Sequence, residues 1–154
     1  MKLEALDNAN EELKRADHLF YVSLKYTRTV DVIKNVVERL INACSFIIES
    51  LAHHLHEKGK LDEIPKFPKL RADAVKEIIK DNPELVNYID FFLLLRKIDK
   101  AEFSRSQEFR RHVTMTCTID GETLNIKIDT VKEYFEKVKS FRDVVKNIVD
   151  AEEQ

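Results

Sequence analysis

A cluster of three histidines, His53, His54 and His56, with glutamates on either side could hold a metal ion. Glu49, His53 and either His56 or Glu57 follow one another at spacings of four and then three or four residues, so they share one face of a helix. Imidazole nitrogens and carboxylate oxygens are common ligands of divalent metal ions. The alternative is that these imidazoles lie in solvent, where the last turn of a helix favours positive charge. We favour this alternative, because two neighbouring leucines occupy the buried face.

A basic stretch from Arg96 to His112 could contact the phosphates of a nucleic acid. It contains six Lys and Arg residues against three acidic residues. Phe103 and Phe109 lie between the basic residues, where aromatic rings could stack on bases. The alternative is a solvated helix end with both Phe rings in the core, which we favour because so small a surplus of positive charge is common. The candidate nucleic-acid-binding residues are Arg96, Lys97, Lys100, Arg110 and Arg111.

The same stretch contains an Arg and a His separated by six residues, Arg105 and His112. With an all-helical bundle and a highly charged surface, this spacing resembles that of the HEPN-type helical domains of prokaryotes. The resemblance implies an up-and-down bundle that dimerises and, as in many of these domains, a metal-independent ribonuclease with Arg and His paired at the dimer interface. It implies that His112 is the acid or base at the ribose 2′-hydroxyl and that Arg105 stabilises the phosphorane charge. Both roles suit the side chains, because His titrates near neutral pH and Arg is a forked cation that binds phosphate.

The two cysteines, Cys44 and Cys117, fall on apolar faces, so we expect buried thiols rather than nucleophiles. They are too few for a disulfide framework, and neither has metal-binding spacing. The two glycines are far apart, so the sequence contains no glycine-rich loop that could bind phosphate. We therefore expect no nucleotide-hydrolysing activity and no cofactor.

The 154 residues fit one domain, residues 1–154, that needs no disulfide or metal to fold. The formal net charge of −2, from 26 basic and 28 acidic residues, gives the whole chain no overall attraction to nucleic acid or anionic lipid. Acidic residues interrupt the N-terminus, and the apolar run from Ile89 to Leu95 is far shorter than the roughly 20 residues of a membrane span. We expect a cytoplasmic protein without a membrane segment. Abundant Lys and Glu with almost no Gln resemble the composition of hyperthermophile proteins.

Apolar residues recur every three or four positions over most of the chain and predict a helical bundle. Two amphipathic helices account for residues 1–58, with a break at Thr27–Thr29, where either threonine can cap the second helix. One unbroken helix is the alternative. Gly59 ends the second helix, and residues 64–69, which contain two prolines, run extended.

Two further helices are expected before residue 101. A short helix spans about Arg71–Lys80, and Asn82 followed by Pro83 begins the next one. The second half of that helix is apolar nearly all round, which is typical of a central helix. We expect it to continue, or to restart after a kink, through Ala101–Phe103 toward Phe109.

Residues 112–128 change to a period of two and predict a β-hairpin. Asp120-Gly121 is a preferred two-residue turn. Pairing across it places apolar side chains on one face, and the other face, with Asn125, Lys127 and the threonines, should meet solvent. Because an isolated hairpin is marginal in water, it must pack on helices, pair with a second copy, or both. The expected pairs are Ile119 with Glu122, Cys117 with Leu124, Met115 with Ile126 and Val113 with Ile128.

Thr130-Val131-Lys132-Glu133 has the pattern of a capping box, with Thr130 as the N-cap of a final amphipathic helix. The fold class is therefore mainly α, a bundle of four to five helices with one β-hairpin before the last helix. Free hairpin edges and the apolar central helix favour a homodimer.

The expected function is a non-enzymatic interaction or regulatory module that acts as a dimer, with RNA as a candidate partner and no membrane. One alternative is a HEPN-like metal-independent endoribonuclease. The other is a metal-binding helical bundle.

Overall fold

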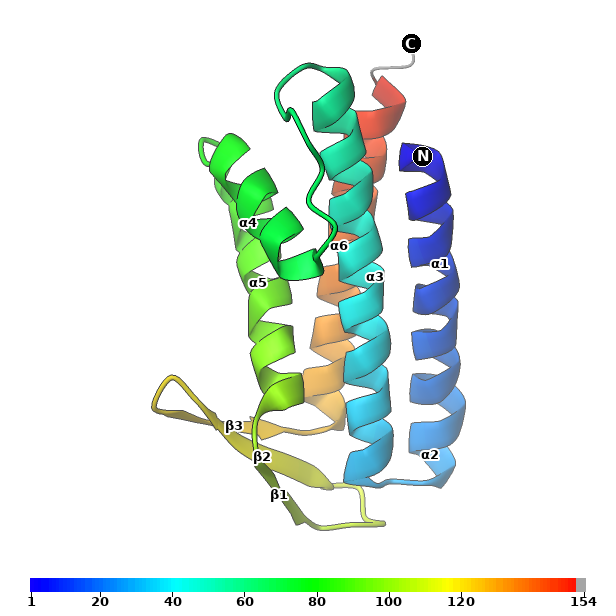
Figure 1. Cartoon of the computed structure of the whole chain (residues 1–154). Coiled ribbons are helices and arrows are strands. Elements are labelled where there is room, and N and C mark those ends of the chain that lie inside the picture. The colour runs from blue at the N-terminus through cyan, green and yellow to red at the C-terminus, as the bar shows by residue number, and fades with distance from the viewer. Residues whose placement is uncertain (152–154) are drawn as a thin grey trace.

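The central element of the fold is the 28-residue helix α3 (Val30–Glu57), as seen in a computed structural model that describes residues 1–151 (Figure 1). Thr29 caps its first turn, because the Thr29 hydroxyl oxygen accepts a hydrogen bond from the backbone N–H of Val32 at 3.3 Å. Its stripe of Val, Ile and Leu is buried, since four other helices pack against it.

The chain reaches α3 through a helical segment that changes pitch. Helix α1 (Lys2–His18) continues into one turn of π-helix, η1 (Leu19–Ser23), and ends in α2 (Leu24–Tyr26). The predicted break at Thr27–Thr29 is confirmed, with Thr29 as the cap, and one unbroken helix is excluded. The sequence did not predict the π turn, which widens the helix locally, so that Leu24 is buried whereas Tyr21 is half exposed.

Helix α4 (Pro68–Ile78) packs against α3 and begins three residues earlier than predicted. The reason is Pro68, whose fixed φ and missing N–H suit the first position of a helix. The segment predicted to be extended, residues 64–69, ends at Phe67, so the prediction is wrong for Pro68 and Lys69. Gly59 ends α3 with a φ of 73°. Arg71 holds this segment by donating to the carbonyl oxygens of Pro65 and Lys66, both at 3.0 Å.

Helix α5 (Pro83–Lys100) begins as predicted, with Asn82 accepting a hydrogen bond from the N–H of Leu85 at 3.2 Å. The predicted helical continuation toward Phe109 is wrong. The backbone turns extended at Ala101 and forms strand β1 (Phe103–Ser106). Phe-Ser-Arg-Ser alternates large and small side chains with a period of two, which suits a strand.

Strands β2 (Thr114–Ile119) and β3 (Glu122–Ile126) form the predicted hairpin, and β1 adds a third antiparallel strand in the order β1-β2-β3. Asp120 and Gly121 make the turn with φ values of 51° and 83°. Three predicted pairs are confirmed, but Val113 does not pair with Ile128, because Ile128 already lies in the next helix. The confirmed pairs are Ile119 with Glu122, Cys117 with Leu124 and Met115 with Ile126.

The sheet lies across the end of the bundle opposite the N-terminus (Figure 1). Its inner face is buried on α3, α5 and the last helix, and includes Val113, Met115 and Ile126. Its outer face is solvent-exposed as predicted, except that Thr114 is buried. The predicted fold class, a mainly α bundle with a β-hairpin before the last helix, is confirmed.

The last helix, α6 (Ile128–Ala151), begins three residues before the predicted first helical residue, Val131. Thr130 is therefore inside the first turn and is not the N-cap. Its hydroxyl oxygen accepts a hydrogen bond from the N–H of Lys127 at 3.2 Å, and the Lys127 carbonyl accepts from Val131 at 3.0 Å. The chain passes from β3 into α6 with one residue between them, which moves the cap position to Lys127. Within residues 1–151 no helix is long and apolar enough to span a membrane.

Candidate functional site

A pocket of about 550 Å³ lies where η1 and α2 meet the β1–β2 loop and the start of α6. Its floor is apolar and is formed by Phe20, Leu24 and Ile128. We call it the basic pocket, because the rest of its lining is dominated by cations. The basic lining residues are Lys25, Arg28, Arg111, His112 and Lys127.

The Lys and Arg residues of the basic pocket have no carboxylate partner among residues 1–151. Within residues 1–151, Lys25, Arg28, Arg111 and Lys127 form no ion pair. Asp129 is the one acidic residue among the described residues that line the pocket. Four cations and one carboxylate around apolar side chains give the lining a surplus of positive charge, which favours a ligand with a phosphate and a flat apolar part.

The π turn shapes the wall of the pocket nearest α1. Phe20 and Tyr21 pack edge to face, with ring centroids 4.9 Å apart. Leu24 is buried in the core, whereas the next residue, Lys25, is exposed. π-Helical turns within longer helices often occur at functional sites, so this distortion is a second feature that singles out the region.

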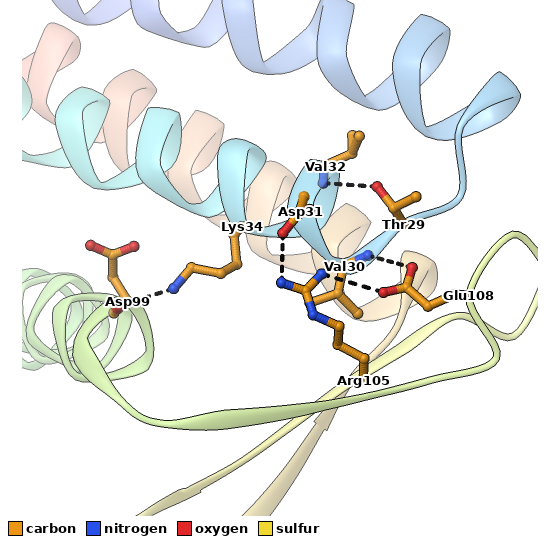
Figure 2. Close-up of polar contacts among 8 residues, drawn as sticks. All are labelled: Thr29, Val30, Asp31, Val32, Lys34, Asp99, Arg105 and Glu108. Carbon is orange, nitrogen blue, oxygen red and sulfur yellow. Dashed lines mark hydrogen bonds and ion pairs between the residues drawn. The ribbon is translucent and has the colours of Figure 1, made fainter.

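The opposite wall comes from the loop between β1 and β2, which is fastened to the linker before α3 (Figure 2). The N–H of Phe109 donates to the carbonyl oxygen of Arg28 at 2.6 Å. The Glu108 carboxylate accepts a hydrogen bond from the N–H of Val30 at 3.1 Å, at the N-terminus of α3. These two bonds fix the loop that carries Arg111 and His112.

Arg105, the residue that we paired with His112 on sequence spacing, lies on β1 and has other partners (Figure 2). Its guanidinium is 2.8 Å from Asp31 and 3.4 Å from Glu108. The hydrogen bond that Arg105 donates to the Asp31 carboxylate is the main cause of a raised pKa at Arg105, and Glu108 adds to it. Arg105 does not line the basic pocket, whereas His112 does. Within one chain the structure therefore does not bring Arg105 and His112 into one pocket.

The two phenylalanines of the basic stretch have different environments. Phe103 is half-buried between two cations, with the Lys34 Nζ atom 4.6 Å and the Arg105 guanidinium 5.2 Å from its ring centre. The ring of Phe109 is 75% exposed. The expectation that both rings enter the core is wrong for Phe109, because it lies in an exposed loop and not in the predicted helix.

The structure divides the five predicted nucleic-acid-binding residues between two surfaces. Arg96, Lys97 and Lys100 line a pocket between α4 and α5, where Lys97 forms an ion pair with Asp120 at 2.8 Å. Arg110 and Arg111 belong to the β1–β2 loop, and only Arg111 lines the basic pocket. Strand β1 lies within the basic stretch from Arg96 to His112, so the basic residues before and after β1 lie on different surfaces.

The predicted metal ligands Glu49, His53 and His56 lie near the end of α3. Within residues 1–151, no group of three or more His, Cys, Asp or Glu side chains is placed to hold a metal ion. His56 Nδ1 is 2.8 Å from the carbonyl oxygen of Leu61. The expectation that all three histidines face solvent is wrong for His54, which is 4% exposed. Helix α3 has neighbours on several sides, so its buried face is wider than one leucine stripe.

Both cysteines are buried and free, as predicted. Burial raises the pKa of the Cys44 thiol far above its ordinary value, and it also raises the pKa of Cys117. Both thiols therefore stay protonated and act as small apolar side chains.

Sequence reasoning missed Lys25, Arg28 and Lys127. Lys25 lies at the end of a helix, Arg28 in the break before α3 and Lys127 between β3 and α6, so only tertiary packing unites them with Arg111 and His112. No protein-family model, no curated protein and no solved structure matches the chain.

Proposed function

We propose that the protein is an interaction module that binds single-stranded RNA in the basic pocket and acts as a dimer. The observation that carries this proposal is the group of four unpaired cations around an apolar, aromatic floor. Proteins bind single strands with this combination, because cations contact phosphates while rings stack on bases.

The phosphate contacts are assigned to Arg28 and Arg111. Both guanidiniums lie in the pocket lining, and each is a forked donor suited to two phosphate oxygens. Lys25 and Lys127 add charge, and His112 is a further donor when protonated. The Arg105 guanidinium already has two carboxylate partners, so its role is to hold the loop in place.

Fluorescence anisotropy with a labelled pool of short single-stranded RNA tests the proposal. We expect the double variant Arg28→Ala/Arg111→Ala to bind about tenfold more weakly or worse, because charged hydrogen bonds are lost. The slope of log affinity against log salt should become shallower by about 1.4, since each phosphate contact on a single strand contributes roughly 0.7.

The matched control is Lys60→Ala/Lys66→Ala, which removes the same charge from exposed residues outside the basic pocket. We expect this control to bind RNA about as tightly as the wild type, because it removes no pocket contact. Equal losses in the two double variants would show that binding reflects net charge and would contradict the pocket assignment.

A second candidate function is metal-independent RNA cleavage, favoured by the position of His112 among the pocket cations. In such a reaction the ribose 2′-oxygen bonds to the adjacent phosphorus and the bond from phosphorus to the 5′-oxygen breaks. One general base takes the 2′-hydroxyl proton and one general acid gives a proton to the leaving oxygen. His112 would serve as one of these groups, and His112 of a second copy would serve as the other.

Cleavage is tested with the same RNA pool in the presence of a metal chelator. We expect His112→Ala to lose cleavage while its thermal unfolding stays that of the wild type, because His112 is exposed. His56→Ala, an exposed histidine on α3, is the control. RNA that stays intact with excess wild-type protein would rule out this second function and leave the binding proposal standing.

A further inference from the structure

Phe109 combines an exposed ring with a strained backbone. It has a φ of 65°, in the left-handed region that bulky residues avoid, and Gln107 in the same loop has a φ of 55°. Its side chain is 75% exposed, so burial of the ring does not compensate for the strain. Strained residues of this kind concentrate at binding sites, where the surrounding structure holds them in place.

The surroundings of Phe109 hold it beside the basic pocket. Its N–H donates to the carbonyl oxygen of Arg28, a pocket residue, at 2.6 Å. The preceding residue, Glu108, accepts from the N–H of Val30 and pairs with Arg105 (Figure 2). The backbone of Phe109 is thus held against the backbone of Arg28, and Phe109 lies two residues before Arg111 in the same loop.

The Lys and Arg residues of the basic pocket form no ion pair within residues 1–151, which distinguishes this pocket from the one between α4 and α5. Five Lys and Arg residues and two carboxylates line the pocket between α4 and α5, and these carboxylates pair with Lys76 at 2.6 Å and with Lys97 at 2.8 Å. The net charge of the whole chain is −2. A duplex binder neutralises a row of phosphates along a continuous basic face, whereas a cluster around one pocket suits one or two nucleotides.

From this geometry we infer that the basic pocket selects unpaired RNA, with a phosphate between Arg28 and Arg111 and the adjacent base stacked on Phe109. The inference rests on the proposed function and assigns its stacking residue. A base within a duplex has both faces covered by its neighbours, so only an unpaired base can offer a face to the Phe109 ring.

The first experiment replaces the ring by an aliphatic side chain. We expect Phe109→Leu to bind single-stranded RNA roughly 5- to 150-fold more weakly, the range for loss of one stacked base. Phe67→Leu is the matched control, because Phe67 is 69% exposed and lies at the start of α4. Phe109→Tyr keeps the ring and is expected to restore wild-type affinity.

The second experiment uses the absence of tryptophan from the sequence. Phe109→Trp introduces a single indole, and stacking on a base should quench its emission when single-stranded RNA is added. Phe67→Trp should show no quenching. A duplex of the same sequence should quench Phe109→Trp weakly and should bind the wild type more weakly than the single strand does.

The outcomes separate this inference from the proposed function. Loss of RNA binding in Arg28→Ala/Arg111→Ala with full binding in Phe109→Leu and no quenching in Phe109→Trp would overturn the role of Phe109 and leave the pocket assignment intact. Duplex binding as tight as single-strand binding would overturn the selection of unpaired RNA. Failure of the wild type to bind any RNA would overturn the proposed function together with the inference.

Discussion

Arg28 contributes to the basic pocket through its side chain and its backbone. The side chain lines the pocket, and the carbonyl oxygen accepts the hydrogen bond that positions Phe109. A substitution at Arg28 removes the charge and leaves the backbone bond, so it tests the ligand contact with little effect on the loop. Arg105 is the opposite case, because its guanidinium binds Asp31 and Glu108 outside the pocket.

The backbone strain of the β1–β2 loop leads to a stability prediction at Gln107. Left-handed backbone costs a residue with a side chain about 1–2 kcal/mol, and the added chain freedom of glycine costs roughly 0.5–1 kcal/mol. We therefore expect Gln107→Gly to raise the free energy of unfolding by about 0.5 kcal/mol, measured by urea titration. Gln107→Ala keeps the strain and should give no gain. A Gln107→Gly variant less stable than the wild type would contradict this account.

At the scale of elements, sequence patterns predicted the features that depend on residues close together in the chain. The hairpin follows from Asp120-Gly121 and from alternation that both strands share, and the break before α3 follows from Thr29. Strand β1 escaped prediction because four residues are too few to establish a period next to a long helix. The predicted start of α6 was wrong. Thr130 fits a capping box, but the chain that leaves β3 already becomes helical at Ile128.

The two threonines therefore differ in their expected effect on stability. Thr29→Ala removes the side-chain cap of the central helix and should lower the free energy of unfolding by about 1 kcal/mol. Thr130→Ala removes one exposed hydrogen bond inside the first turn of α6 and should cost about 0.5 kcal/mol. Chemical unfolding of both variants checks the order. A larger loss for Thr130→Ala would support a cap at Thr130 and contradict the helix start at Ile128.

At the scale of the whole molecule, the candidate site is assembled from residues 20–28, 111–112 and 127–129. No pattern in the sequence joins these segments, because their proximity depends on how the sheet docks against the bundle. The site lies at the end of the bundle that carries the sheet, and the N-terminus lies at the other end (Figure 1). The uncompensated cations are therefore concentrated where three segments meet, although the chain as a whole is slightly acidic.

The free edges of the sheet are the basis for our prediction of a homodimer. β1 pairs with one edge of the hairpin, so β1 and β3 have free edges in a single chain. Free edges pair with other strands unless charge, proline or a bulge blocks them. The exposed side chains on the outer face of β3, Thr123 and Asn125, are uncharged. Antiparallel pairing of β3 with β3 of a second copy would join two sheets about a two-fold axis and place two basic pockets in one assembly.

Sedimentation at micromolar concentration tests this prediction, with a mass of two chains as the expected result. Thr123→Lys places a charge on the edge strand and should shift the protein to a single chain. Thr118→Lys places the same charge on the exposed face of the central strand β2, so it should leave the dimer intact. A wild type that sediments as one chain at every concentration would exclude the dimer. A dimer that survives Thr123→Lys would place the interface elsewhere, and the half-buried Leu93 and Leu94 of α5 would be the next residues to change.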